Sequence, residues 1–380
     1  MNHCEILVAH PSPDLYGSDL QMLVTVQALM QEGWGVTVVI PVDGPLSSRL
    51  RACGAQVLVS AMPVLRKSVL TPRGLVGFLA QSLSGTWRSV RMVRSRRPDV
   101  VLVNTVTIPT WLLGARLART PVLSHVHEAE EEQGRVVRSL LAGQLLLADR
   151  IVVNSAAARR ALVQVVPWLE RRLRVVHNGV PGPPAPLSDL RQRTPDEPLR
   201  AVLVARLSPR KGVDVALEAV AQLRREGQDV SLDICGTVFD GYEWYEEELR
   251  RRAAMPDLAG AVTFHGYVSP TWPALERADV VLVPSRVEPF GNTAVEAMLA
   301  GRPLVASGVQ GLLEVVTDLS TGLHVRPGDS QSLADALLRI AREPSMARGL
   351  ARAAQGEARR RFSPETYSEL MVGSVRQLMA

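Results

Sequence analysis

The chain has 380 residues, 46% of them hydrophobic, and a formal net charge of +5. This length exceeds the roughly 250–300 residues over which a single hydrophobic core usually grows, so we expect two domains. The three cysteines lack metal-site spacing, and the sequence shows neither a signal-peptide pattern nor an apolar run of about 18 residues. We therefore expect a cytoplasmic protein that does not span a membrane and, because its charge is mixed and no recognition motif occurs, does not bind nucleic acid.

Short apolar runs alternate with helical patterns along the chain, which predicts an α/β protein with parallel sheets covered by helices on both faces. The strands expected in the first half are Glu5–Ala9, Val36–Ile40, Val57–Val59, Val100–Val103, Val122–Ser124, Ile151–Val153 and Arg174–Val176. The proline-rich segment 181–198 can continue neither a sheet nor a helix. It predicts a linker, with an N-terminal domain over 1–185 and a C-terminal domain over 196–361.

The loop after the first expected strand ends at Gly17 and Ser18, where a helical pattern begins. Backbone N–H groups at such a helix start can face a phosphate or a sugar. The loop does not match the G-x-G-x-x-G fingerprint, so dinucleotide binding is not indicated.

Residues 61–98 are rich in basic side chains, contain no acidic one, and include the apolar residues Phe78, Leu79 and Trp87. The basic residues are Arg66, Lys67, Arg73, Arg88, Arg91, Arg94, Arg96 and Arg97. A basic helix with an apolar face can lie on an anionic membrane, which would make residues 66–97 a peripheral membrane contact. A solvated helix flank explains the same pattern, and the sequence leaves both interpretations open.

The segment 121–128, PVLSHVHE, predicts a strand on which alternation places His125 and His127 on one face. Either residue could be a buried structural histidine. Metal binding is not favoured, because no third ligand follows at helical spacing.

In the second half, the expected strand Arg200–Ala205 is followed by a loop and then by an amphipathic helical pattern over Val213–Arg225. Arg206 and Lys211 lie in this loop, at the carboxyl end of the strand, where ligands of open α/β sheets bind. Their charges suit a diphosphate. A solvated loop is the alternative.

A second strand, loop and helix start spans the expected strand Val280–Val283 and the helical run Ala294–Ala300. We expect Asn292 or Thr293 to cap this helix, whose free N–H groups attract anions. Glu288 and Glu296 lie eight residues apart across the helix start, and their carboxylates can accept hydrogen bonds from vicinal diols. This arrangement suits a sugar nucleotide, although Thr293 and Glu296 also match a capping box that would serve the helix alone.

The spacing of Arg206 and Lys211, and of Glu288 and Glu296, resembles the R-x4-K pair and the E-x7-E motif of the family 4 retaining glycosyltransferases. Further matches are 177–180, 265–268 and the Gly-Asp pair at 328–329. The resemblance covers most of the chain, but the first loop has Gly17-Ser18 where the family usually has two glycines. It implies the GT-B fold, two Rossmann-like domains facing a central cleft, with a last helix over 362–380 that crosses back onto the first domain.

The resemblance implies catalytic roles for Arg206, Lys211, Glu288 and His127. It implies donor contacts for Glu296, Gly17, Ser18, Phe290, Gly291, Asn292, Tyr267 and Val268. The two cations would neutralise the leaving diphosphate without a metal or other cofactor. Glu296 would hold the ribose, and Glu288 would orient the sugar together with backbone N–H groups. His127 would contact the sugar from the opposite domain.

The predicted function is therefore transfer of a sugar, with retention of configuration, from a UDP- or GDP-linked donor to a hydroxyl acceptor. A lipid-linked acceptor in cell-envelope or polysaccharide assembly would fit a protein held at the inner face of the membrane. A soluble natural product remains an alternative acceptor. A GT-B sugar-nucleotide epimerase, which needs no acceptor, and a sensor that binds without turnover are the alternatives from other classes. The E-x7-E spacing favours transfer over the epimerase.

Overall fold

The computed structural model describes residues 4–65, 72–127, 134–194, 197–239 and 241–379. The predicted basic residues Arg66 and Lys67 lie outside these ranges, and so does the side chain of Arg73. The chain divides into two compact units, residues 1–179 with 364–380, and residues 180–363. They are called here the first and the second unit.

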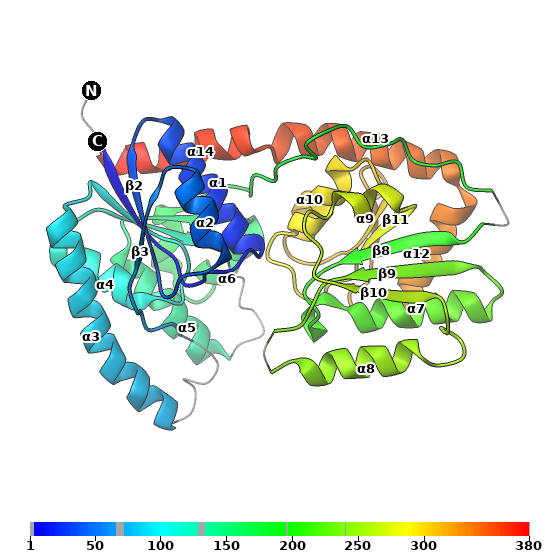
Figure 1. Cartoon of the computed structure of the whole chain (residues 1–380), viewed down its shortest axis with the longest axis horizontal. Coiled ribbons are helices and arrows are strands. Elements are labelled where there is room, and N and C mark those ends of the chain that lie inside the picture. The colour runs from blue at the N-terminus through cyan, green and yellow to red at the C-terminus, as the bar shows by residue number, and fades with distance from the viewer. Residues whose placement is uncertain (1–3, 66–71, 128–133, 195–196, 240, 380) are drawn as a thin grey trace. The chain divides into compact units, whose positions relative to one another are not determined.

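The first unit is built on a parallel sheet whose strands, in the part of the chain that the structure describes, follow the order β3-β2-β1-β4-β5-β6-β7 (Figure 1). The bounds are β1 (Glu5–Ala9), β2 (Gly35–Ile40), β3 (Gln56–Val59), β4 (Val100–Val103), β5 (Val122–Val126), β6 (Arg150–Val153) and β7 (Leu173–Val175). The central strands are runs of buried valine, isoleucine and leucine, as a parallel sheet covered on both faces requires. The expected strands agree with these bounds to within two residues.

The helices of the first unit cover both faces of this sheet. They are α1 (Gly17–Gln31), α2 (Pro45–Ala52), α3 (Pro72–Arg96), α4 (Pro109–Ala118), α5 (Arg135–Gly143), α6 (Ala156–Val163) and α14 (Pro364–Met379), with the 3₁₀ turns η2 (Gln144–Leu147) and η3 (Pro167–Arg172). The last helix, α14, packs against α1, where Tyr367 contacts Thr25 through their hydroxyls. Helix α3 runs along α4 (Figure 1), and Ser89 donates a hydrogen bond to the Thr110 carbonyl at 2.9 Å.

The second unit contains a parallel sheet in the order β10-β9-β8-β11-β12-β13. Its strands are β8 (Leu199–Val204), β9 (Val230–Cys235), β10 (Val262–Gly266), β11 (Val280–Val283), β12 (Leu304–Ser307) and β13 (Leu323–Val325). Its helices are α7 (Val213–Arg225), α8 (Glu243–Ala253), α9 (Trp272–Arg277), α10 (Asn292–Leu299), α11 (Leu312–Val315), α12 (Ser330–Arg342) and α13 (Pro344–Arg361), with the turn η4 (Pro209–Lys211). The described part of the segment 181–198 forms neither helix nor strand.

Both sheets reverse their strand order in the same way. In the first unit the chain runs outward from β1 to β3 and returns to β4 beside β1, and in the second unit it runs from β8 to β10 and returns to β11 beside β8. The carboxyl ends of β1 and β4, and of β8 and β11, are therefore topological switch points, where open α/β sheets bind ligands. In the described part of the chain, no helix has the length and hydropathy needed to cross a bilayer.

Candidate active site

The two motif loops of the second unit meet at the carboxyl ends of β8 and β11. The ammonium group of Lys211 donates to Glu288 Oε2 at 2.5 Å, and the Ser285 hydroxyl donates to the same oxygen at 3.3 Å. Both charged side chains are partly buried. A cation suited to a phosphate and a carboxylate suited to hydroxyl groups thus lie side by side.

Close backbone approach holds these two loops together. Gly212 has φ 65°, and a Cβ there would lie 2.0 Å from the carbonyl oxygen of Pro284, so only glycine fits. The Arg286 N–H donates to the Arg210 carbonyl at 2.7 Å, and the Arg286 guanidinium donates to both carboxylate oxygens of Asp214 at 2.8 and 2.6 Å. This bidentate pair fixes the loop that carries Lys211.

Glu296 does not close its own helix, so the capping-box alternative is wrong. Its Oε2 accepts a hydrogen bond from the Thr271 hydroxyl at 3.0 Å, a contact made across the unit rather than within α10. Burial raises the pKa of Glu296 from its usual 4.5 to about 7, against the opposing effect of that hydrogen bond. Additional hydrogen-bond donors at this buried carboxyl group would favour its charged form.

The cap expected at Asn292 or Thr293 is also wrong, because helix α10 begins at Asn292 with Gly291 as its N-cap. Gly291 has φ 112°, and a Cβ there would approach a Leu312 methyl group to 2.6 Å. A left-handed glycine replaces the side-chain cap because the chain must turn sharply here. The Phe290 side chain is buried against Phe362, with ring centroids 5.6 Å apart, so only its backbone is placed to serve a ligand.

The remaining predicted residues of the second unit follow β8 and β10. Arg206 stacks its guanidinium over the Phe239 ring, 3.0 Å from the centroid, which holds the cation at the carboxyl edge of the sheet. Tyr267 directly follows β10 and is 51% exposed, and Val268 packs partly buried against the core beside α10.

In the first unit, His127 directly follows β5 and joins a chain of polar side chains. Its Nε2 lies 3.0 Å from Asn104 Oδ1, and the Asn104 amide nitrogen lies 3.0 Å from His10 Nδ1. His10 Nε2 in turn lies 2.8 Å from Asp19 Oδ1. Burial lowers the pKa of His127 to about 3, so the ring is neutral at physiological pH.

Gly17 and Ser18 form the exposed first turn of α1. Asp19 follows them, and its second oxygen accepts the Tyr16 N–H at 2.8 Å. Burial opposes ionisation of Asp19, but its hydrogen bonds with His10 and Tyr16 prevail and lower its pKa. The predicted first loop and the predicted histidine are therefore linked through Asp19.

His125, on β5, and His127, just after it, lie on the same side, as the alternation predicts, with ring centroids 4.0 Å apart. The His125 ring is fully buried and stacks near Tyr367, with centroids 6.2 Å apart. Burial lowers the pKa of His125 well below its usual value, so this residue is a neutral core histidine.

Comparison with known proteins assigns both halves of the chain. Residues 17–181 match the family described as Glycosyltransferase Family 4, and residues 189–357 match Glycosyl transferases group 1. A D-inositol 3-phosphate glycosyltransferase of Acidothermus cellulolyticus is 31% identical over 361 residues, which cover 91% of this chain and 77% of that protein. A glycogen synthase of Mycobacterium tuberculosis is 31% identical over 288 residues, which cover 72% of this chain and 68% of that protein.

The chain belongs to the family 4 glycosyltransferases. The crystal structure of Anabaena HepE in complex with UDP-glucose matches its fold with a TM-score of 0.83 at 24% identity, covering 99% of this chain and 100% of the other. The protein is therefore a nucleotide-sugar-dependent glycosyltransferase with the GT-B fold.

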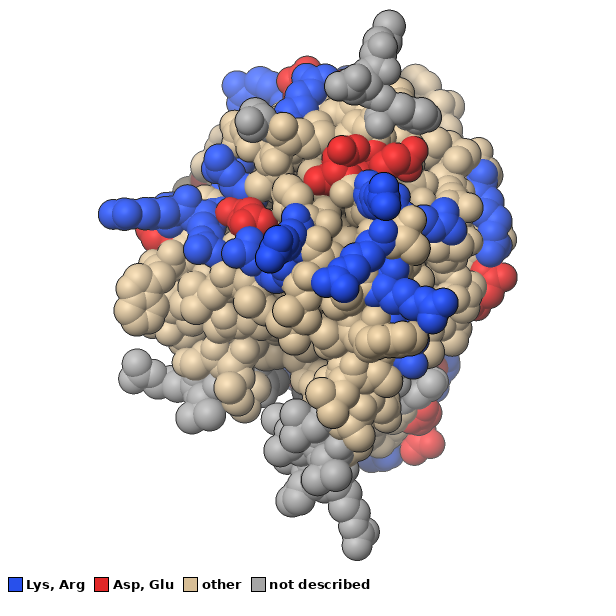
Figure 2. Space-filling model, turned by 90° about the vertical axis from the view of Figure 1, so that its left-hand side faces the viewer, with Lys and Arg blue, Asp and Glu red and all other residues tan. Residues whose placement is uncertain are grey.

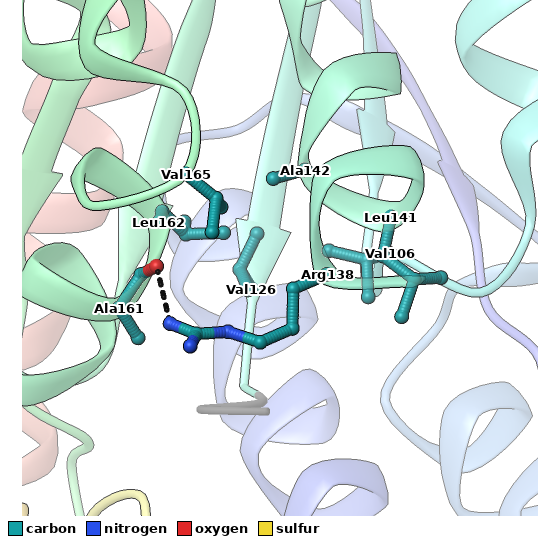
Figure 3. A pocket seen from close by; sticks show the side chains of 8 residues that line it. All are labelled: Val106, Val126, Arg138, Leu141, Ala142, Ala161, Leu162 and Val165. Atoms are coloured by element: carbon teal, nitrogen blue, oxygen red, sulfur yellow. Dashed lines mark hydrogen bonds between the residues drawn. The ribbon is translucent and has the colours of Figure 1, made fainter. Parts of the chain in front are cut away.

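A small pocket of this glycosyltransferase lies at the carboxyl end of β5, where Val126 lines it (Figure 3). Its volume is about 30 Å³, and its lining is Val106, Val126, Arg138, Leu141, Ala142, Ala161, Leu162 and Val165. Figure 3 shows Arg138 reaching across it to donate to the Ala161 carbonyl, at 3.2 Å. A cavity of this size holds about one or two waters, so it is too small for a sugar.

Three polar residues of this glycosyltransferase were not predicted from its sequence as part of the site: His10, Asp19 and Asn104. Each is a single polar residue without a motif, but His10 and Asn104 directly follow the adjacent strands β1 and β4. Polar residues at the carboxyl ends of neighbouring parallel strands were the available signal. In the described residues, no group of three or more His, Cys, Asp or Glu side chains is arranged to hold a metal ion.

Proposed function

We propose that this glycosyltransferase moves a hexose from a UDP-linked donor, with retention of configuration, to a hydroxyl acceptor in polysaccharide or cell-envelope glycan assembly. The observation that carries the proposal is the contact between Lys211 and Glu288 at a switch point of the second sheet. The similarity to HepE, whose structure contains UDP-glucose, supports UDP over GDP.

When the donor binds, the contact between Lys211 and Glu288 is replaced by contacts of each residue with the donor. Lys211 turns from Glu288 to the diphosphate, where Arg206 supplies the second positive charge. Glu288 then accepts hydrogen bonds from the sugar, together with the N–H groups of Phe290, Gly291 and Asn292. The ribose hydroxyls donate to Glu296, and Tyr267 and Val268 flank the nucleotide.

The transfer step needs no protein nucleophile in this scheme. The bond between the anomeric carbon and the diphosphate oxygen breaks, the bond to the acceptor oxygen forms on the same face, and the acceptor proton passes to the leaving phosphate. Arg206 and Lys211 stabilise the charge that develops on the diphosphate, so we expect no metal or other cofactor to be required. In the first unit, His127 contacts the transferred sugar, and the first turn of α1 at Gly17 and Ser18 faces the reacting groups.

A thermal-shift panel of UDP, GDP, ADP and their sugar conjugates tests the donor. A ligand at 100 times its Kd stabilises by about 2.7 kcal/mol, so we expect a clear shift with UDP and its conjugates alone. Transfer to a panel of hydroxyl acceptors, with the anomeric configuration of the product read by NMR, tests the reaction. Isomerisation of the donor without acceptor, or binding without any turnover, would replace the proposal by an epimerase or a sensor.

The outer surface of the first unit supports an acceptor at a membrane. Helix α3 exposes Leu83 and Trp87, at 79% and 62% of their full accessible area, and the Arg91 guanidinium lies over the Trp87 ring, 5.4 Å from the centroid. Figure 2 shows this side of the molecule, where basic side chains outnumber acidic ones. An aromatic residue beside arginines on an exposed helix suits the headgroup region of an anionic bilayer.

Co-sedimentation with vesicles tests this contact at the inner face of the membrane. We expect binding to vesicles that contain an anionic lipid, weaker binding to neutral ones, and a loss of binding in Arg91→Glu. The matched control Arg359→Glu makes the same charge change on α13, in the second unit. Equal recovery of the wild type with neutral and anionic vesicles would contradict the role of the basic side chains. No recovery with either would leave a soluble acceptor as the better proposal.

A further inference from the structure

Three adjacent strands of the first sheet are each followed directly by a polar residue: His10 after β1, Asn104 after β4 and His127 after β5. Because the strands are parallel, these residues meet at one edge of the sheet. With Asp19 from α1 they form one continuous chain, in which every contact between neighbouring side chains measures 2.8–3.0 Å.

The direction of each hydrogen bond in this chain follows from its acidic end. Asp19 carries a lowered pKa and is a carboxylate, so it can only accept, and His10 must donate from Nε2. The Asn104 amide nitrogen can only donate, and it lies 3.0 Å from His10 Nδ1, so Nδ1 is the acceptor of this contact. The amide oxygen of Asn104 is left facing His127, and it accepts the proton on His127 Nε2.

Burial restricts the chain to one arrangement of hydrogen-bond donors and acceptors. His10, Asp19 and Asn104 are at most 2% exposed, so water cannot replace the two contacts among them. Turning the Asn104 amide over would set its N–H groups against His127 Nε2 and its oxygen against the lone pair of His10. A buried polar group without a partner is costly, so the chain favours a single arrangement.

We propose that Asn104 is a positioning residue that, with His10 and Asp19, holds His127 as its Nε2–H tautomer, so that Nδ1 accepts a hydrogen bond from a hydroxyl of the transferred sugar. The sugar contact rests on the proposed function, whereas the tautomer does not. The lowered pKa of His127 agrees with a neutral ring that accepts a hydrogen bond from a hydroxyl, and not with a charged ring that donates a proton.

The tautomer is measured on the full chain without donor, by NMR of protein labelled with ¹⁵N in its seven histidines. A His127→Gln variant identifies the His127 signals. At mildly alkaline pH we expect His127 to show a protonated Nε2 and an unprotonated Nδ1. In Asn104→Leu the acceptor for the Nε2 proton is lost, and we expect a mixture of tautomers.

Two further variants separate positioning from general damage. Asn104→Asp keeps an oxygen for His127 Nε2–H and should preserve the tautomer, which also covers the case in which Asn104→Leu fails to fold. Asn154→Ala removes the side chain that donates to the His127 carbonyl at 3.3 Å but touches neither ring nitrogen, so the tautomer should again be unchanged. A protonated Nδ1 in the wild type, or a changed tautomer in Asn104→Asp, would overturn the proposal.

Transfer kinetics test the sugar contact. With the natural donor, Asn104→Leu should lower kcat/KM by about 5- to 10-fold, the loss expected for one hydrogen bond. The same comparison is made with a series of donors in which one sugar hydroxyl at a time is replaced by fluorine, which cannot donate a hydrogen bond. With the donor that lacks the hydroxyl bound by His127, wild type and Asn104→Leu should have the same kcat/KM. An equal difference with every fluorinated donor would overturn the contact. If the wild type transfers no sugar at all, the proposed function fails, and the NMR result still decides the tautomer.

Discussion

The polar edges of the two sheets differ in how their residues are held. The first unit presents His10, Asn104 and His127 as a hydrogen-bonded chain that ends on one carboxylate, and His10 and Asn104 are buried. The second unit presents Lys211 and Glu288 as a partly buried ion pair whose partners can be exchanged for a ligand's charges. The hydrogen bonds of the first edge fix the orientation of its side chains. The charged groups of the second edge can bind a ligand and stabilise its charge. Substitutions should therefore damage stability at the first edge and turnover at the second.

The largest expected effect is the loss of Lys211. Lys211→Ala should lower kcat by about 10²–10³-fold, the usual result of removing one group that stabilises transition-state charge, while the melting temperature changes little. The matched control Arg210→Ala removes a positive charge from the exposed neighbouring residue and should leave kcat close to that of the wild type. Steady-state kinetics and calorimetry measure both. If Lys211→Ala kept the wild-type kcat, the expectation that substitutions at the second edge reduce turnover would be wrong.

Loss of Glu296 should act on binding. Glu296→Ala should weaken nucleotide affinity by about 10- to 100-fold, because it removes a carboxylate that accepts hydrogen bonds from the ribose. Glu248→Ala, which removes an exposed carboxylate from α8, is the control. The thermal shift with UDP should disappear in the first variant and persist in the second. A full shift in Glu296→Ala would leave that carboxylate with a structural role only.

A substitution at the first edge should appear as lost stability. Asp19→Ala leaves the His10 Nε2–H and the Tyr16 N–H without their acceptor, which we expect to cost about 1–3 kcal/mol. Asp14→Ala changes an exposed carboxylate in the same loop and should be nearly neutral. Urea denaturation compares the two variants, and equal midpoints would show that the polar chain contributes nothing to stability.

The smallest effect is a pH dependence at Glu296. Folding raises its pKa from 4.5 to about 7 and so favours the protonated form, which means that its contribution to stability falls as pH rises through this interval. Ribose hydroxyls favour the carboxylate, so UDP affinity should improve as pH rises through about 7. Glu296→Gln cannot ionise and reports any titration of the nucleotide itself. The difference between the two calorimetric profiles isolates Glu296, and parallel profiles would contradict its contact with the ribose.

Local pattern was sufficient for most of the fold. Strands of the first half were placed to within two residues because runs of valine and leucine between turn signals identify buried parallel strands. The two bounds expected for the fifth strand, Val122–Ser124 and 121–128, bracket β5, which runs from Val122 to Val126 through the buried His125.

The candidate site was predicted where its residues belong to contiguous motifs. The motif spacing singled out Lys211, Glu288 and Glu296, but not that Lys211 and Glu288 pair, nor that Glu296 bonds to Thr271 rather than to its own helix. The N-cap of α10 was misassigned because Gly291 takes this position in a left-handed conformation, without a side chain that caps the helix. Such contacts depend on which loops the sheet brings together.

The sequence by itself determined the family, the strand and helix pattern and the charged motifs, because dihedral preference, periodicity and spacing are properties of neighbouring residues. The tertiary structure alone decided that His10, Asn104 and His127 form one chain, because each follows a different strand, with His10 and Asn104 lying 94 residues apart in the sequence and Asn104 and His127 lying 23 residues apart. Strand order makes them neighbours, and burial then leaves each polar atom dependent on the next.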